Sequence, residues 1–346
     1  MNYSKVQVTA IGYELAPVVV TSDELESRLT PMMERLHISE GQLEFLTGIS
    51  ERRWWPPNTP VSQGATAAGK KALTTANIPV EEIGSVIYCG VCRELYEPAT
   101  ACRVADGLGI RNSTAVYDIS NACLGVLNGM LEVANRIELG QIRAGLVVSC
   151  ESAREINDTM IERMLQMDDM QTFTMALATL TGGSGAVAVL LTDGSFDDNA
   201  GHQLLGGMTQ VAPEHHELCR WGIEKHNGSY RPFMSTDSVN VLKNGVELGK
   251  RTWDAFTKEM NWTTDQVDRV ICHQVGSAHQ DEILKTLGID KAKDFTTFEH
   301  LGNIGTVSLP MTAAIADERG VLQRGEHVAF LGIGSGLNCM MLGLKW

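Results

Sequence analysis

The sequence predicts a mixed α/β fold built from two packed halves. Short apolar segments rich in β-branched residues alternate with longer segments of helical character, and this alternation is typical of layered sheets covered by helices. It occurs both before and after residues 193–235, and neither a Pro/Ser-rich linker nor a run of charges separates the two groups. We therefore expect an N-terminal half, 1–192, and a C-terminal half, 193–346, joined near 193–235.

The first half is predicted to contain five strands and four helices. Strands buried on both faces are short, apolar and β-branched. The expected strands are Val6–Tyr13, Ser85–Cys92, Thr114–Ile119, Gly145–Cys150 and Gly185–Thr192. The expected helices are Ser22–Leu36, Ser62–Thr75, Pro98–Leu108 and Leu124–Leu139. Asp23 and Glu24 follow Ser22, and negative charge in the first turn favours a helix start.

The second half repeats the pattern. The expected helices are Asp237–Met260, Ala278–Leu287 and Val307–Glu318. The expected strands are Val270–Gln274, His327–Leu331 and Cys339–Leu344. The uncharged stretch from His327 to Leu344 is interrupted by glycines, so it indicates two strands joined by a glycine turn and not a membrane span.

Composition and charge indicate a globular protein, and the lack of a secretory signal indicates the cytoplasm. Hydrophobic residues make up 43% of the 346 residues, and 28 Lys and Arg face 42 Asp and Glu, which gives a net charge of −14. Nucleic-acid binding needs a basic face, so we expect no nucleic-acid partner. Met1–Pro17 lacks the apolar core of a signal peptide. The eight cysteines are therefore expected to be reduced thiols.

Cys123 is the strongest candidate nucleophile. It lies in Tyr117–Gly125, where an apolar strand ends, small residues turn the chain and an apolar helix begins. A thiol at a helix start meets unpaired N–H groups and the positive end of the dipole, which favour the thiolate. A buried, inert cysteine is the ordinary alternative.

Two further polar residues follow predicted secondary structure in the same way. His273 ends a strand 150 residues after Cys123, and Asn303 sits between glycines ahead of a helix, 30 residues later. A histidine in the core and an asparagine in a turn are the ordinary interpretations. A Cys nucleophile with distant His and Asn partners is an accepted pattern for thiol catalysis, and all three could converge at one end of the sheets.

These segments resemble the condensing enzymes of the thiolase superfamily, in the branch of β-ketoacyl-ACP synthase III. The matches run in order from about residue 45 to the C-terminus. They are Thr47–Arg53, Asp118–Gly125, His273-Gln274, Gly302-Asn303, Ser308–Pro310 and Leu331–Leu337. The resemblance implies a duplicated, thiolase-like fold of five layers, αβαβα, and a homodimer.

The resemblance also implies a role for each residue. Cys123 would attack an acyl thioester and hold the acyl group. His273 and Asn303 would donate hydrogen bonds to the second thioester as it becomes an enolate. The turn at Gly334 and Ser335 would help to hold the oxyanion. No metal or other cofactor is implied, because the acyl-CoA or acyl carrier protein thioester is itself the substrate.

Glu97 suggests which member of the superfamily this is. It resembles the glutamate that head-to-head acyl-CoA condensing enzymes of the bacterial olefin pathway place across the dimer interface as a base. The ordinary alternative is a solvated carboxylate at a helix start. Initiating synthases carry an arginine where this chain has Ala278, and Gln42 and Leu46 replace their adenine-binding residues.

Five other residues are weaker candidates for substrate binding. Arg52 and Arg53 are the nearest cations for the phosphates of CoA, although exposed arginines are more often merely solvated. Met160, Met164 and Met167 are spaced for one helical face. Flexible thioethers suit a wall for alkyl chains, but such a stripe is more often core or dimer contact.

The function expected from these features is acyl transfer with C–C bond formation. The favoured version is condensation of two medium- or long-chain acyl-CoAs without decarboxylation, giving a β-keto product. The alternative is the initiating 3-oxoacyl-ACP synthase III of fatty acid synthesis, which uses malonyl-ACP. A thioesterase with the same cysteine and a silent paralogue are the alternatives from other classes.

Overall fold

The computed structural model describes residues 1–346 apart from 112–113, 167–168, 197–200 and 227. Within these residues, nine strands form one mixed sheet in the order β11-β12-β13-β8-β1-β7-β6-β4-β5. The strands of the first half are β1 (Gln7–Leu15), β4 (Ile83–Tyr88), β5 (Ala115–Asp118), β6 (Ala144–Glu151) and β7 (Gly185–Thr192). Those of the second are β8 (His202–Val211), β11 (Arg269–Cys272), β12 (His327–Gly334) and β13 (Asn338–Lys345).

The sheet contains the same four-strand unit twice. In the first half, β4 and β6 are parallel, and β7 and β1 follow in antiparallel pairs. In the second, β11 and β12 are parallel, and β13 and β8 follow in antiparallel pairs. The two units join where β1 pairs with β8 through only two residue pairs, Gln7 with Gln203 and Val8 with His202. The chain is therefore a structural duplication.

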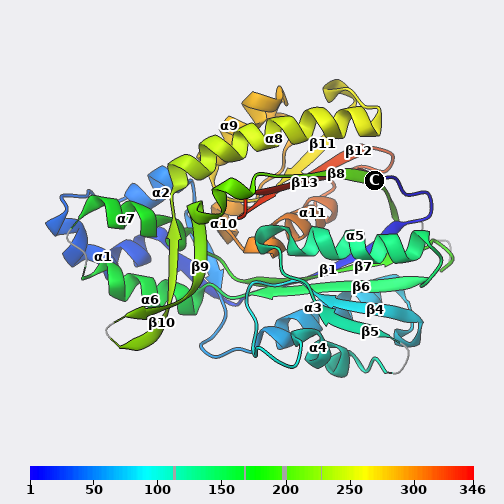
Figure 1. The fold of residues 1–346 in the computed structure, drawn as a ribbon, viewed down its shortest axis with the longest axis horizontal. Coiled ribbons are helices and arrows are strands. Elements are labelled where there is room, and N and C mark those ends of the chain that lie inside the picture. Colours follow the sequence, from blue (N-terminus) through cyan, green and yellow to red (C-terminus); the bar gives the residue numbers. More distant parts are fainter. Residues whose placement is uncertain (112–113, 167–168, 197–200, 227) are drawn as a thin grey trace.

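Helices cover the two halves of the sheet and fill the space between them. In Figure 1, α5 and α11 lie between the two halves, α3 and α4 lie outside the first, and α8 and α9 lie outside the second. The bounds are α3 (Val61–Ala76), α4 (Thr100–Leu108), α5 (Gly125–Glu138), α8 (Ser238–Met260), α9 (Ser277–Leu287) and α11 (Ser308–Glu318). This gives the five layers, αβαβα, that the resemblance implied.

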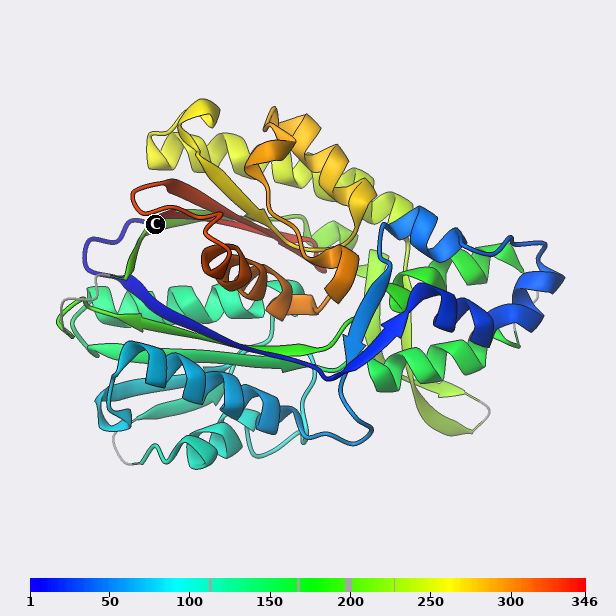
Figure 2. The same ribbon diagram turned by 180° about the vertical axis from the view of Figure 1, so that it is seen from behind.

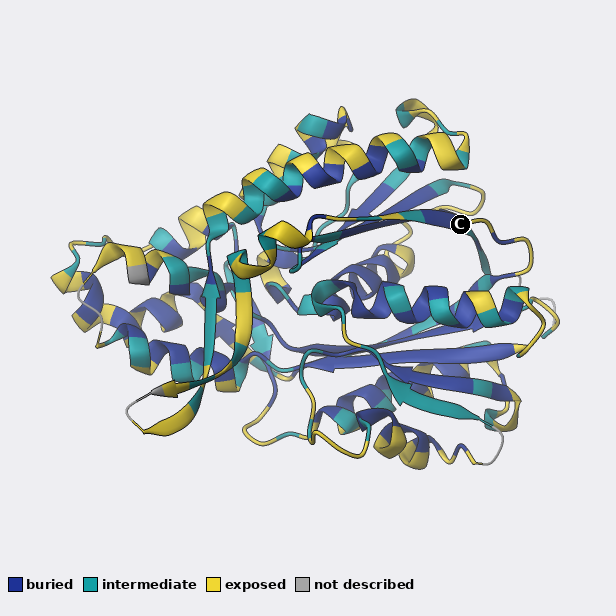
Figure 3. Ribbon diagram, in the orientation of Figure 1, coloured by how far each residue is buried: buried dark blue, intermediate teal, exposed yellow. Residues whose placement is uncertain are grey.

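The hydrophobic core follows the layers. One cluster joins α5 and α11 to both halves of the sheet, and separate clusters lie beneath α3 with α4 and beneath α8 with α9. Figure 3 shows the consequence for the two kinds of helix: the central α11 is almost entirely buried, whereas α8 is exposed along its outer face. Central helices that are apolar all round are expected only where both faces are covered.

A lobe of smaller elements lies beside the layered body (Figures 1 and 2). Its helices are α1 (Ser22–Arg35), α2 (Gln42–Thr47), α6 (Arg154–Met164), α7 (Met170–Leu177) and α10 (Phe298–Leu301). Its strands are β2 (Val18–Thr21), β3 (Glu51–Trp54), β9 (Cys219–His226) and β10 (Ser229–Thr236). A fourth apolar cluster holds α1, α6 and α7 together.

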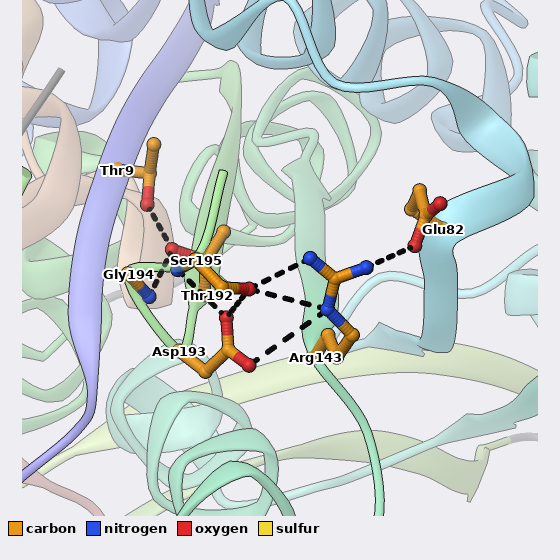
Figure 4. Close-up of polar contacts among 7 residues, drawn as sticks. All are labelled: Thr9, Glu82, Arg143, Thr192, Asp193, Gly194 and Ser195. Atoms are coloured by element: carbon orange, nitrogen blue, oxygen red, sulfur yellow. Dashed lines mark hydrogen bonds and ion pairs between the residues drawn. The ribbon is translucent and has the colours of Figure 1, made fainter. Parts of the chain in front are cut away.

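A network of polar contacts lies at the end of β7, where the first half of the chain ends (Figure 4). The Arg143 guanidinium donates to Ser195 Oγ at 2.8 Å and to Glu82 Oε2 at 3.2 Å. The hydroxyls of Thr9 and Thr192 share a hydrogen bond of 2.8 Å. The network ties β1, β6 and β7 together at the place where the boundary between 192 and 193 was expected, and that boundary stays a prediction.

The observed elements agree with the order predicted from the sequence, because every expected strand and helix has a counterpart. The elements that were not predicted include β8, which lies in the main sheet where the two halves join, and much of the lobe, above all the hairpin of β9 and β10. In the part of the chain that the structure describes, no helix combines the length and hydropathy needed to cross a membrane.

Candidate active site

Five of the predicted site residues meet at one cavity. The cavity has a volume of about 370 Å³ and lies where the ends of β11, β12 and β13 approach the start of α5. Cys123, His273 and Asn303 line it together with Gly334 and Ser335. The rest of the wall is mostly apolar, and includes Leu177, Val239, Leu242, Val246, Ile283, Leu331, Ile333 and Met341.

Cys123 sits in a tight turn between β5 and α5. The turn is a single 3-10 turn, Ala122–Leu124, and Ala122 has a positive φ of 44°. This left-handed backbone conformation is disfavoured for residues other than glycine, and where it occurs it is often at a functional site. The hydroxyl of Thr306 accepts the N–H of Val126 at 2.7 Å. This bond fixes the start of α5 against the turn that follows Asn303.

The glycine loop lies directly against Cys123. A Cβ placed on Gly334 would lie 3.4 Å from the backbone nitrogen of Cys123. At Gly332, a Cβ would come within 2.6 Å of the Leu124 side chain, so only glycine fits there without displacement. Asn338 Nδ2 donates to Asn121 Oδ1 at 3.0 Å and to the carbonyl of Ser335 at 3.1 Å. These bonds hold the loop and the nucleophile segment together.

The amide of Asn303 is oriented by its own turn. The backbone N–H of Asn303 donates to the Thr181 carbonyl at 2.8 Å, and its carbonyl accepts from Gly183 at 2.9 Å. Its side-chain Oδ1 accepts the N–H of Gly305 at 3.0 Å. Because the oxygen is engaged in this way, the Nδ2 donor is the atom that Asn303 can offer to a ligand.

His273 is neutral at physiological pH. Burial lowers its pKa to about 4, and the neighbouring His279 adds to this effect. Its backbone N–H donates to the Leu331 carbonyl at 2.9 Å, whereas Nδ1 is buried and has no hydrogen-bond partner among the described residues. A neutral imidazole has one donor and one acceptor nitrogen, so His273 can donate to a substrate oxygen or accept a proton.

The thiol of Cys123 is protonated in the absence of substrate. Burial raises its pKa to about 12, and Cys219 and Glu151 contribute further. This corrects the expectation that the helix start favours the thiolate. The apolar cavity disfavours the charged form more than the dipole stabilises it, and α5 itself begins only at Gly125.

Alkylation of Cys123 by iodoacetamide should therefore rise with pH without a plateau near neutrality. Only the thiolate reacts, and well below the pKa its fraction grows about tenfold per pH unit. Mass spectrometry of the Cys123 peptide between pH 7 and 9 measures this, with the exposed Cys102 as a reference in the same sample. A rate that levels off near pH 7 would mean that the free enzyme holds a thiolate.

Glu97 lies outside this cavity. It is exposed and follows Leu95 and Tyr96, which are 45% and 97% exposed. It does not cap α4, because the carboxylate of Asp118 accepts the N–H groups of Thr100 and Ala101 at 2.9 Å each. The N–H groups at the start of α4 are therefore satisfied by Asp118 and not by Glu97.

The two arginines do not reach the cavity. Arg52 is fully buried, and its guanidinium donates to Ser22 Oγ at 3.0 Å and to the Val20 carbonyl at 3.4 Å. Burial lowers its pKa to about 10. Arg52 therefore ties β3 to α1 and β2 and is not placed on a surface where phosphates would bind. Arg53 is half-buried, and its carbonyl accepts the Ser184 N–H at 2.7 Å.

Two of the three candidate methionines also lie away from the cavity. Met160 and Met164 are buried in the cluster formed by α1, α6 and α7, which is the core position that such a stripe more often takes. Met167 lies outside the described residues. Among those that are described, no group of three or more His, Cys, Asp or Glu side chains could hold a metal ion.

Cys219 and His279 are among the polar residues of the cavity that the sequence analysis missed. Cys219 begins β9 and shares a hydrogen bond of 3.4 Å with the Thr236 hydroxyl. His279 lies on α9, where burial lowers its pKa. His279 lies in the first turn of α9, close in sequence to His273, which directly follows β11.

The comparisons agree with this geometry. The thiolase N-terminal domain model matches residues 58–182, and the 3-oxoacyl-ACP synthase III C-terminal model matches 257–346. Acyl-CoA:acyl-CoA alkyltransferases of Shewanella oneidensis and Xanthomonas campestris are 58% and 36% identical to the chain, each over 100% of both proteins. A cysteine-to-serine variant of Xanthomonas campestris OleA, crystallised with lauric acid and lauroyl-CoA, has a TM-score of 0.92 at 36% identity and covers 99% of this chain and 100% of its own.

The duplicated fold and the two family models define a thiolase-fold acyltransferase. Within that class, the chain belongs to the acyl-CoA:acyl-CoA alkyltransferase family, since similarity to two of its members extends over the whole length of both proteins.

Proposed function

We propose that this protein joins two medium- or long-chain acyl-CoAs head to head, without decarboxylation, through an acyl-enzyme on Cys123. The observation that carries the proposal is the convergence of Cys123, His273 and Asn303 on one apolar cavity in a chain of this family. The initiating synthase is less favoured, because the full-length relatives at 58% and 36% identity are alkyltransferases.

The reaction has two covalent steps. First, Sγ of Cys123 attacks the thioester carbonyl of one acyl-CoA, the bond to the CoA sulfur breaks, and CoA leaves with the thiol proton. Second, a base removes an α-proton from the other acyl-CoA, and the α-carbon attacks the carbonyl of the acyl-enzyme. The Cys123 thiolate leaves and takes up the proton, so that a β-ketoacyl-CoA is released. No step requires a metal or a redox cofactor.

The polar groups of the cavity stabilise the two oxyanions. His273 and Asn303 Nδ2 donate to the oxygen of the second thioester as its α-carbon loses a proton. The backbone amides of Cys123 and of the turn at Gly334 and Ser335 hold the oxygen of the acyl-enzyme carbonyl during attack. Fixed donors inside an apolar cavity are especially effective, because they need no reorganisation when charge develops.

Glu97 serves as the base, and it acts in the site of a second copy. Two features support this assignment: Glu97 lies outside its own cavity, and two exposed apolar side chains, Leu95 and Tyr96, precede it at the tip of its loop. A homodimer would cover these side chains and bring Glu97 of the partner subunit to the substrate. We place the reaction in the lipid metabolism of the cytoplasm, in a route that leads to olefinic hydrocarbons.

The substrate is a long-chain acyl group bound to CoA as a thioester. The apolar wall suits an alkyl chain, and lauroyl-CoA is bound in the Xanthomonas structure. Ala278, which is exposed on α9, stands where initiating synthases have an arginine for the carrier protein. The loss of that charge favours acyl-CoA over acyl carrier protein as the donor.

Product analysis tests the function directly. Wild-type protein incubated with myristoyl-CoA alone should give a β-keto product and free CoA. Acetyl-CoA with malonyl-ACP should give no more product than a blank. Product only with malonyl-ACP would instead make the protein an initiating synthase, and myristic acid without condensation would make it a thioesterase.

The His273→Ala variant separates the two steps. Condensation should fall by about 10²–10³, the usual cost of losing one oxyanion donor, whereas acylation of Cys123 should fall much less. Intact-protein mass spectrometry follows the adduct, and chromatography follows the product. If both steps fall equally, His273 acts mainly as the base for Cys123.

A further inference from the structure

Glu151 is a buried carboxylate that the proposed reaction does not use. It ends β6 and is only 4% exposed, and a buried charged group is costly unless hydrogen bonds compensate for lost water. Here both oxygens are engaged: Oε1 accepts the N–H of Val91 at 2.9 Å, and Oε2 accepts that of Cys92 at 3.0 Å. Glu151 therefore fixes the backbone where the chain leaves the core after β4.

The segment that begins at Val91 is the arm that carries Glu97; we define the arm as residues 91–99. At its base, the Tyr88 hydroxyl donates to the Cys92 carbonyl at 2.6 Å. Farther along, Glu94 accepts the Ser62 N–H at 2.7 Å. Beyond the arm, Asp118 holds the first N–H groups of α4. The tip, residues 95–98, is exposed, so the arm has a fixed base and a projecting end.

Glu151 also lies near its own active site. A Cβ placed on Gly305 would lie 3.5 Å from the side chain of Glu151, and the N–H of Gly305 donates to Asn303 Oδ1. Glu151 makes no side-chain hydrogen bond to Gly305 among those described, whereas the arm receives two charge-assisted hydrogen bonds, which are strong and directional interactions. The arm is therefore the part of the structure that Glu151 orients most directly.

We propose that Glu151 is a positioning residue that sets the direction of the arm, and so places Glu97 in the cavity of the partner subunit. The inference rests on the proposed function, in which Glu97 is the base for the second acyl-CoA of the neighbouring copy. Two consecutive N–H groups held by one buried carboxylate fix both the position and the rotation of the peptide plane, so a small error at the base of the arm is carried to its tip.

The Glu151→Gln variant weakens this anchor with little change in volume. One carboxylate oxygen becomes an NH₂ group, which faces a backbone N–H donor and cannot accept from it. Condensation should fall by about 10- to 100-fold, as expected for a displacement of about 1 Å at a reacting group, while acylation of Cys123 remains. Glu151→Asp, which keeps the charge but is shorter by one methylene, should give the same pattern.

The matched control is Glu138→Gln. Glu138 Oε2 also accepts two consecutive backbone N–H groups, from Ser4 at 3.0 Å and Lys5 at 3.1 Å. It lies at the far end of α5 from Cys123. This variant should leave the ratio of condensation to acylation unchanged, so that a general loss of a carboxylate anchor is distinguished from loss of the anchor at the arm.

Mixed dimers decide whether Glu151 acts through the arm. The two variants are co-expressed with different affinity tags, and purification on both tags gives a dimer of one Glu151→Gln protomer and one Cys123→Ala protomer. Its remaining nucleophile receives Glu97 from the Cys123→Ala protomer, whose arm is intact. Condensation should therefore return to about half of the wild-type rate. A dimer of Glu97→Ala with Cys123→Ala protomers is the reference for delivery of Glu97 across the interface.

Two results would overturn the proposal. If the reference dimer recovers but the Glu151→Gln dimer does not, Glu151 acts on its own site, through Asn303 or through general stability, and not through the arm. If the reference dimer also fails, Glu97 does not act across the interface; the proposed base is then wrong, and the role of Glu151 falls with it.

Discussion

Replacing Cys123 by alanine is expected to abolish both acylation and condensation. Every covalent step of the proposed reaction passes through Sγ, and loss of the nucleophile in an enzyme of this kind costs on the order of 10⁴ or more in rate. Intact-protein mass spectrometry after incubation with myristoyl-CoA should show an acyl adduct on wild type and none on Cys123→Ala.

Cys219→Ala is the comparison for this experiment, because Cys219 lines the same cavity but has no covalent role in the proposal. This variant should still be acylated at Cys123. A full-sized adduct on Cys89 or Cys272, together with an active Cys123→Ala variant, would exclude Cys123 as the nucleophile.

The second large effect is expected for Glu97→Ala. The α-carbon of a simple thioester gives up its proton only to a base, whereas decarboxylation of malonyl-ACP produces the same enolate without one. Condensation of two acyl-CoAs should therefore fall by about 10²–10⁴, the usual contribution of a general base. Acylation of Cys123 should persist, because that step does not involve the α-proton.

The control is Glu81→Ala. Glu81 is also an exposed carboxylate, and it lies in the short helical turn Val80–Glu82. It should condense at the wild-type rate. If Glu97→Ala does the same, Glu97 is only a solvated carboxylate, and the proton must be removed by another group of the cavity.

Most strands of the layered body could be predicted from the sequence because they are short apolar runs, whereas β8, which mixes buried, half-buried and exposed residues, was missed. The strands β6 and β7 are buried at every position, so their sequences are continuous apolar runs between helices. The hairpin of β9 and β10 was missed for the opposite reason. Its residues are largely exposed, and Pro232 lies within β10, where a proline argues against a strand.

The site was predictable wherever a residue had a local signature. Cys123, His273 and Asn303 each follow a strand or a turn in a recognisable motif, and the fold brings them to one cavity. The environment of a residue was not predictable in the same way. Nothing in the segment Glu51–Trp54 indicates that Arg52 is fully buried. The burial that raises the pKa of Cys123 is likewise invisible in its own segment, because most residues that line the cavity come from beyond residue 200.

The most direct test of the central claim is a chase of the acyl-enzyme. Wild-type protein is acylated with myristoyl-CoA that carries ¹³C at the carbonyl, freed of CoA and unreacted substrate, and mixed with unlabelled lauroyl-CoA. We expect loss of the Cys123 adduct and a crossed β-keto product whose ketone carbon carries the label. Release of labelled myristic acid without the crossed product would contradict the account, because the Cys123 adduct would then lead to hydrolysis and not to condensation.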